Sequence, residues 1–245
     1  IILPKKGDGG MLNNIRRSIV QRAKSHIQFG APPIDVMEVG KLRPDLLVTA
    51  SFPQIISSEV LAMARIGALH IHMSLLPRHR GIDPLFWTYM DDDCIAGVTI
   101  HWMTGRIDAG DILAQEAVEF VRGLASRDLY MRLAHIGAEM LASVLEKIAS
   151  GDVRGLPQDD SLSTTGSAAD VARTRVPFSI WPAERTWHVL SGLGDQHSDL
   201  LHNSDNQTLH HGRARTYSVT DDVHPGRIVP CGPYYEVHCK DGVVI

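Results

Sequence analysis

Two histidines spaced two residues apart are the first residues in this chain that suggest chemistry. His70 and His72 come at the end of an apolar stretch, residues 66–71, that has the pattern of a buried strand. Side chains two residues apart on a strand point to the same face, so both imidazoles should face the same way. Imidazole gains and loses a proton near neutral pH, which suits acid–base catalysis. A pair of ordinary core or surface histidines is the alternative, and the spacing alone does not decide between the two.

A loop follows the two histidines without an intervening helix. Ser74, Pro77, Gly81 and Pro84 interrupt any regular element over this stretch. Open α/β sheets bind their ligands just beyond the carboxyl ends of their strands. Two histidines at a strand end that opens into such a loop therefore predict an active site at this edge of a sheet.

Three ordered motifs, all between residues 42 and 120, carry a family resemblance. They are His72-x-Ser-Leu-Leu-Pro-x-x-Arg-Gly, then Gly97-Val-Thr-Ile-His-Trp-Met, then Ile107-Asp-Ala-Gly-Asp-Ile-Leu. Together they resemble the formyltetrahydrofolate-dependent formyltransferases, which act on glycinamide ribonucleotide, methionyl-tRNA, nucleotide-linked amino sugars and amino acids. The chain departs from the family at one position, because the family pattern Asn-x-His is here His70-x-His72.

The resemblance implies a catalytic pair for formyl transfer. In that reaction the amine loses a proton, the tetrahedral oxyanion is stabilised, and the departing folate nitrogen regains a proton. His72 and Asp108 match the family's catalytic histidine and aspartate, and the carboxylate would orient the imidazole and raise its pKa. The alternative for Asp108 is a turn residue that caps its own loop.

His70 stands where the family has an amide, which always offers both a donor and an acceptor. A neutral imidazole donates from only one nitrogen. His70 either replaces the amide as the oxyanion donor, most effectively when protonated, or marks a different reaction. It is also compatible with a chain that binds folate without transferring formyl. The residues alone leave these three possibilities open.

The resemblance further implies 10-formyltetrahydrofolate as the formyl donor. An apolar wall made by residues 75–77 would suit an aromatic pterin, and loop rigidity is the alternative role of the same residues. The residues expected at the donor site are Ser74, Leu75, Leu76, Pro77, Gly81, Gly105 and Ile107.

Composition narrows the class of protein. The chain has 245 residues and a formal net charge of −4, so nothing drives it as a whole toward nucleic acid or anionic membranes. No apolar run is long enough to span a bilayer, and the first residues lack the order of a signal peptide. Three widely spaced cysteines, Cys94, Cys231 and Cys239, fit no disulfide framework. These features favour a cytoplasmic protein.

The pattern of apolar residues predicts an α/β fold. We expect a doubly wound, mostly parallel sheet in a catalytic domain, residues 1–150, from which the family's first strand and helix are missing. The expected helices are residues 11–28, 57–66, 84–90 and 126–150. The expected strands are residues 32–38, 46–50, 66–71, 96–103 and 112–120.

The rest of the chain changes character. Residues 151–176 are rich in Asp, Ser, Thr and Gly and read as a linker. Residues 177–245 predict a small β-rich domain with one helix, residues 183–190. Seven histidines in this part show no metal-ligand spacing, so we expect a solvated surface here and no metal site in the chain. They are His188, His197, His202, His210, His211, His224 and His238.

Charge bears on the acceptor of the formyl group. From residue 151 onward there are eight lysines and arginines against twelve aspartates and glutamates, which argues against tRNA as a partner. We therefore expect a small-molecule amine, either an amino sugar or an amino acid; whether it is bound to a carrier protein, and whether the chain is a homodimer, are left open. The alternatives are a formyltetrahydrofolate hydrolase and a non-catalytic folate- or nucleotide-binding module.

Overall fold

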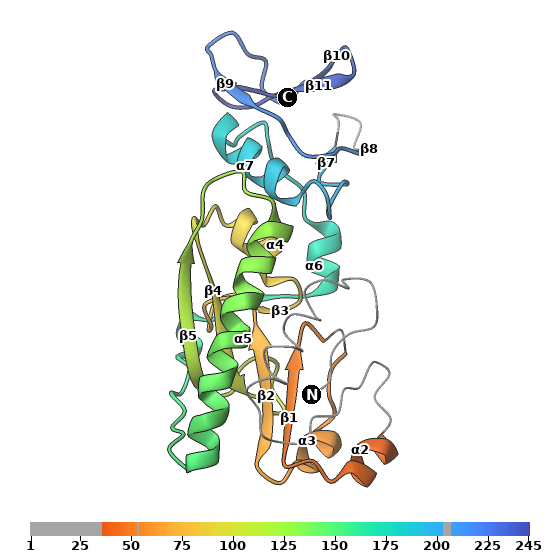
Figure 1. Ribbon diagram of the computed structural model, residues 1–245. Coiled ribbons are helices and arrows are strands. Elements are labelled where there is room, and N and C mark those ends of the chain that lie inside the picture. The colour runs from red at the N-terminus through yellow and green to blue at the C-terminus, as the bar shows by residue number, and fades with distance from the viewer. Residues whose placement is uncertain (1–35, 53, 203–206) are drawn as a thin grey trace. The chain divides into compact units, whose positions relative to one another are not determined.

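A computed structural model describes residues 36–52, 54–202 and 207–245 (Figure 1). The predicted helix at residues 11–28 lies outside the described residues. The chain divides into two compact units. Unit 1 comprises the described residues through Pro84 together with Ala96–Val118 and Tyr130–Gly166, and unit 2 comprises Leu85–Ile95, Glu119–Leu129 and Ser167–Ile245.

Unit 1 is built on a four-stranded sheet with the order β1-β2-β4-β5 (Figure 1). Its strands are β1 (Leu46–Ala50), β2 (Gly67–His72), β4 (Ile95–Trp102) and β5 (Ile112–Glu119). The predicted parallel pair is β1 and β2, whereas β4 runs antiparallel to β2, so the sheet is mixed. The helix between β2 and β4, α4 (Pro84–Met90), has seven residues. At about 10 Å it is too short to carry the chain back along a strand for a parallel crossover.

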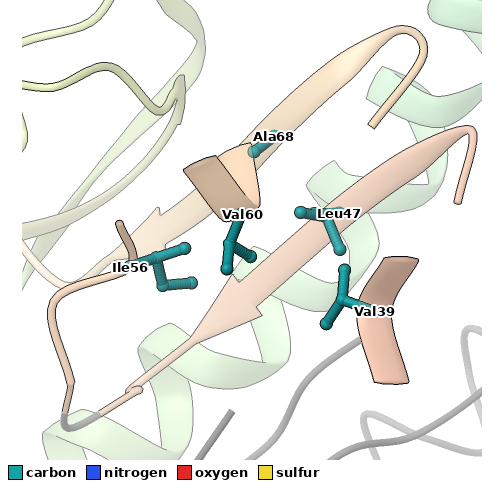
Figure 2. Close-up of a cluster of buried hydrophobic side chains, with 5 residues drawn as sticks. All are labelled: Val39, Leu47, Ile56, Val60 and Ala68. Atoms are coloured by element: carbon teal, nitrogen blue, oxygen red, sulfur yellow. The ribbon is translucent and has the colours of Figure 1, made fainter. Parts of the chain in front are cut away.

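Helices cover both faces of this sheet, as a doubly wound fold requires. On one face, α2 (Val36–Leu42) and α3 (Ser58–Ala62) contribute Val39 and Val60 to a buried cluster with Leu47, Ile56 and Ala68 (Figure 2). On the other face lies α5 (Ser126–Ser150), whose Gly137 leaves room for Ile71 of β2 and Val98 of β4. Ala68 and Ile71 point to opposite faces because side chains alternate along a strand.

Two sequence predictions near the N-terminus of the described chain need correction. Residues 36–38 belong to helix α2 and not to a strand, because Val36 and Val39 are spaced to pack one helical face onto the cluster. Helix α3 begins after its N-cap Ser57 as predicted but ends at Ala62. Its continuation is prevented by backbone hydrogen bonds from Arg65 and Ile66 to the residues that precede β1.

Unit 2 contains an antiparallel sheet with the order β10-β11-β12-β9, on which helix α7 (Ala183–Leu193) packs. Its strands are β9 (Tyr217–Val219), β10 (Ile228–Cys231), β11 (Tyr234–His238) and β12 (Gly242–Val244). A hairpin of β7 (Leu201–His202) and β8 (Thr208–Leu209) and the helix α6 (Ala168–Arg173) complete the described part of this unit. The predicted β-rich C-terminal part is therefore confirmed.

The seven C-terminal histidines do not form one solvated surface, which corrects the sequence prediction. His188 is fully buried in unit 2, where its Nδ1 accepts a hydrogen bond from the backbone N–H of Gly123 at 2.9 Å and its ring stacks on Tyr89. Of the seven, only His210 and His224 are exposed.

Within the described residues, no helix is both long and apolar enough to cross a membrane.

Candidate active site

Strand register brings three polar side chains into one row across unit 1. Thr49 of β1 pairs with His70 of β2, and His70 in turn pairs with His101 of β4. His72, two residues further along β2, projects from the same face. The three histidine rings lie within 6.4 Å of one another between centroids. The predicted alignment of His70 and His72 is thus extended by His101, which sequence reasoning missed.

Asp108 lies where these side chains converge. Its carboxylate Oδ2 is 3.6 Å from His72 Nδ1, and its Oδ1 is 3.5 Å from His101 Nε2. The backbone N–H of Gly81 donates to Oδ2 at 2.8 Å. The backbone of Asp108 is left-handed, with φ 48°, a conformation that costs energy in a non-glycine residue and is common at functional sites. The structure therefore brings the two predicted catalytic residues together.

The hydrogen bonds of two histidines fix which ring nitrogen carries the proton. Nε2 of His72 lies 2.8 Å from the carbonyl oxygen of His79, and Nδ1 of His101 lies 2.8 Å from the carbonyl oxygen of Trp102. A carbonyl oxygen only accepts, so both of these nitrogens donate. The opposite nitrogen of each ring faces the carboxylate of Asp108. Each such nitrogen holds either a lone pair or an additional proton that it shares with Asp108.

Burial separates the roles available to these groups. His72 is 3% exposed and His101 is 1% exposed, whereas the side chain of Asp108 is 12% exposed. His70 is also only partly buried. Asp108 and His70 are thus the groups that a small molecule can reach. His72 and His101 are almost fully buried and contact the carboxylate from the protein interior.

The electrostatics of the site favour an ionised carboxylate beside neutral imidazoles. Burial, together with the neighbouring His72, lowers the pKa of His70 to about 3, against the opposing pull of Asp108. Burial also lowers the pKa of His72 below its ordinary value, although Asp108 acts in the opposite direction. Burial by itself raises the pKa of Asp108, but His101 and the other neighbours outweigh it and keep that pKa below its ordinary value. His70 is therefore neutral at physiological pH.

The loop that carries Asp108 is held by residues from the predicted linker. Gln158 donates from its amide nitrogen to the carbonyl oxygens of Asp108 and Gly110, at 2.9 and 2.7 Å. The amide oxygen of Gln158 accepts two hydrogen bonds from Arg80, which is 4% exposed and also pairs with Asp160 at 2.9 Å. Sequence reasoning missed Gln158, because no local pattern shows which distant loop an amide will contact.

The same segment orders the loop after the histidines. The two-residue strands β3 (Arg80–Gly81) and β6 (Thr165–Gly166) pair in parallel. Gly81 has φ 94°, and a Cβ at this position would come within 2.4 Å of the carbonyl oxygen of Gly166. Only glycine fits there. This close approach places the N–H of Gly81 against Asp108.

The structure places the other residues predicted at the donor site in different surroundings. Ser74 and Leu76 are buried, and Ser74 donates to the carbonyl oxygen of Arg78. Leu75 packs against Gly97, and Pro77 is half-buried. Gly105 is exposed, and Ile107 is 56% exposed beside Asp108. Gly81 and Ile107 are thus adjacent to the site, while Ser74 and Leu76 face into the protein.

Comparison with known proteins identifies the class of protein. The formyl transferase family model matches residues 6–145, more than half of the chain. The chain therefore belongs to the formyl transferase family.

Individual relatives share parts of the sequence. The methionyl-tRNA formyltransferase of Limosilactobacillus fermentum is 30% identical over 204 residues, which cover 81% of this chain and 62% of that protein. The methionyl-tRNA formyltransferase of Moorella thermoacetica is 39% identical over 123 residues, covering 50% of this chain and 40% of that protein. The chain thus spans less than two thirds of the length of these curated relatives.

Solved structures share the fold. HypX from Aquifex aeolicus, in complex with tetrahydrofolic acid, has a TM-score of 0.73 and 17% identity, covering 99% of this chain and 42% of that one. The N-formyltransferase from Helicobacter canadensis, in complex with folinic acid and dTDP-3-aminofucose, has a TM-score of 0.72 and 14% identity, covering 99% and 96% of the two chains. At these identities the likeness establishes the fold alone.

Proposed function

We propose that this chain is an N-formyltransferase that moves a formyl group from 10-formyltetrahydrofolate to the amine of a small molecule. The observation that carries the proposal is the approach of Asp108 to His72, at 3.6 Å, beside the ends of neighbouring strands. Membership of the formyl transferase family supports it. We place the chemistry in the predicted catalytic domain, residues 1–150, with support from the predicted linker, residues 151–176, through Gln158. Residues 177–245 would form the separate β-rich domain that the sequence predicts.

Proton transfer in this reaction falls to Asp108 and His72. The ionised carboxylate of Asp108 is exposed enough to take the proton that the attacking amine loses. His72 Nδ1 shares that proton with Asp108, because the other nitrogen of His72 is held by the carbonyl oxygen of His79. The same pair then returns a proton to the departing folate nitrogen. His101 keeps the carboxylate oriented toward His72 throughout.

The residues present fit a folate donor in part. Asp108 and Gly81 offer polar groups where the formyl carbon would react, and the exposed Ile107 offers apolar surface next to them. Leu76, which we expected to contact the pterin, is buried at 3% exposure. We therefore assign Leu76 to loop packing and propose Ile107 and Gly81 for the donor side of the site. HypX was solved with tetrahydrofolic acid, which supports a folate donor on this fold.

The acceptor is the finer part of the proposal. The excess of acidic over basic residues after residue 150 disfavours a polyanion and supports a small amine. Among the structural neighbours, WlaRD is described as a sugar 3N-formyl transferase, and the Helicobacter canadensis N-formyltransferase was solved with dTDP-3-aminofucose, which supports an amino-sugar acceptor. The relatives named as methionyl-tRNA formyltransferases make methionyl-tRNA the competing acceptor. A hydrolase is the second candidate reaction, because a half-buried neutral His70 beside Asp108 is suited to holding a water molecule.

The test is a product assay with defined acceptors. The full chain is incubated with 10-formyltetrahydrofolate and EDTA, alone or with nucleotide-linked amino sugars, amino acids or methionyl-tRNA, and tetrahydrofolate and formate are both measured. Tetrahydrofolate that forms only with a small amine supports the proposal. Formylation of methionyl-tRNA alone overturns the acceptor class, and formate without any amine supports hydrolysis. No product in any mixture leaves the binding module as the better account.

A further inference from the structure

His70, His72 and Asp108 converge in a way that proton relay does not require. Each of the three residues offers one ligand atom, and these atoms all lie within 4.8 Å of one another. We propose that they form a binding site for a divalent transition metal ion, with Zn²⁺ as the reference ion. This proposal goes beyond formyl transfer and does not depend on it. It also replaces our sequence expectation that the chain has no metal site.

The contact between His72 and Asp108 has the geometry of two metal ligands. The Nε2 proton of His72 is donated to the carbonyl oxygen of His79, so Nδ1 of the neutral ring presents a lone pair to Asp108 Oδ2 at 3.6 Å. Two electron-rich atoms at this distance repel each other unless a proton or a cation lies between them. Ligands bonded to tetrahedral zinc at about 2.1 Å are about 3.4 Å apart. The observed separation is close to that value.

His70 is held in the same manner by Thr49. The hydroxyl of Thr49 donates to the carbonyl oxygen of Leu69 at 3.2 Å and lies 2.7 Å from His70 Nδ1. With the Thr49 proton on the Leu69 carbonyl, His70 Nδ1 donates to Thr49 and Nε2 keeps its lone pair. Histidines that bind metals typically donate their other ring N–H to a fixed acceptor in this way. Both ligand histidines therefore have the outer hydrogen bond that a metal site needs.

His101 is not one of the three ligand residues, but it contacts the carboxylate of Asp108. It is 1% exposed, and its Nε2 makes no hydrogen bond with the part of the chain that the structure describes. This nitrogen faces Asp108 Oδ1 at 3.5 Å, whereas His72 faces Oδ2. The N–H of Gly81 fixes Oδ2. His101 and the Gly81 N–H thus position the carboxylate of Asp108, and the lone pairs of its oxygens remain available to the histidines.

The chemistry of the three ligands selects the ion. Two imidazoles and one carboxylate suit zinc, iron, nickel or copper, whereas magnesium and calcium prefer sites made of oxygen alone. An amide at position 70 would be a much weaker ligand for these transition metals. The metal and the proton relay use the same atoms of His72 and Asp108. Bound zinc would therefore compete with formyl transfer.

The experiment is a calorimetric titration of the metal-free, 245-residue chain with ZnCl₂, without folate or amine, so its outcome is independent of the proposed function. The chain has 13 histidines in all, so variants must locate the ion. We expect one tight equivalent in the wild type, weakened at least about 100-fold in His70→Asn and in Asp108→Asn. Thr49→Val, which removes only the outer hydrogen bond of His70, should weaken binding about 10- to 100-fold.

The matched control is His135→Gln, because the His135 side chain on α5 is 71% exposed and stays outside the site. This variant should bind zinc as the wild type does. Circular dichroism of each metal-free variant establishes that it is folded, and zinc should raise the melting temperature most in the wild type and in His135→Gln, less in Thr49→Val, and least in His70→Asn and Asp108→Asn. The absence of a tight equivalent in the wild type would overturn the proposal. Unchanged binding by folded His70→Asn and Asp108→Asn would overturn it as well.

Discussion

His70 and His101 occupy directly paired positions on β2 and β4, and their ring centroids are 5.6 Å apart. This pairing places a second imidazole beside the histidine that the family resemblance did not explain. It also means that histidines from two strands, β2 and β4, contact Asp108, and not histidines from one strand alone.

Replacement of His72 should abolish most of the activity. His72→Ala removes the imidazole that shares a proton with Asp108, so turnover in formyl transfer should fall by about 10²-fold or more. Steady-state rates with a fixed acceptor measure the loss, and circular dichroism checks the fold. His135→Ala, on the exposed face of α5, serves as the control. Near-normal turnover in His72→Ala would show that His72 is not part of the proton relay.

Restoring an amide at position 70 should separate the two proposed properties of the site. His70→Asn supplies a permanent hydrogen-bond donor where the neutral imidazole offers a lone pair, so formyl transfer should be kept or increased. The same change should remove the tight zinc site. Rates are measured with and without about 50 µM ZnCl₂, a concentration well above the dissociation constants of most zinc sites. Zinc should inhibit the wild type alone. A variant that loses transfer activity while folded would show that the imidazole itself is required.

The low pKa of His70 predicts a dependence of stability on pH. An unfolded histidine takes up its proton near pH 6.5, whereas folded His70 does so only near its pKa of about 3. The unfolded chain therefore binds more protons between these values, and folding stability falls as the pH drops through this window. His70→Asn should lose less stability than the wild type between about pH 7 and about pH 5, as measured by urea unfolding. Equal losses in both proteins would contradict a neutral, half-buried His70.

The loop that carries Asp108 should tolerate a methyl group at one glycine and not at another. In Gly110→Ala the new Cβ would lie 1.9 Å from the carbonyl oxygen of Trp102, so the loop must shift. We expect a loss of about 1–3 kcal/mol in the free energy of unfolding, with lower turnover. Gly105→Ala is the matched control, because its Cβ would meet only Ser58 Oγ at 3.6 Å. Equal effects of the two substitutions would argue against the close packing of this loop.

Gln158 should matter although it lies in a segment that reads as a linker. Gln158→Ala removes two hydrogen bonds to the carbonyl oxygens of Asp108 and Gly110 and leaves Arg80 without its amide partner. A loss of about 1–3 kcal/mol in unfolding free energy is expected. Turnover should fall through kcat more than through KM, since Gln158 positions Asp108. Urea unfolding and steady-state kinetics measure both effects, and an unaltered kcat would assign Gln158 to stability alone.

Local sequence signals predicted the elements on which the site is built. The Pro84–Met90 and Ser126–Ser150 helices begin and end where apolar spacing and capping residues predict, because helix formation depends on near neighbours. The position of His70 and His72 at the end of a strand follows from the same local logic.

What the sequence did not show depends on contacts between distant segments. His101 enters the site only through the register between β2 and β4, and Gln158 only through the way residues 158–166 fold back. The antiparallel direction of β4 likewise depends on how the intervening chain returns to the sheet. Apolar periodicity indicates which face of a strand is buried, but it does not show which distant strand pairs with it or in which direction.

The proposed formyl transfer depends on the carboxylate of Asp108, and one substitution tests this dependence most directly. Asp108→Asn keeps the shape of the side chain and an oxygen that can accept from the Gly81 N–H, but it removes the charge that takes up the amine proton. With 10-formyltetrahydrofolate, EDTA and the best acceptor from the product assay, this variant should transfer formyl about 10²-fold more slowly or worse, while its circular dichroism spectrum is unchanged. Formyl transfer by folded Asp108→Asn at a rate close to that of the wild type would contradict the central claim.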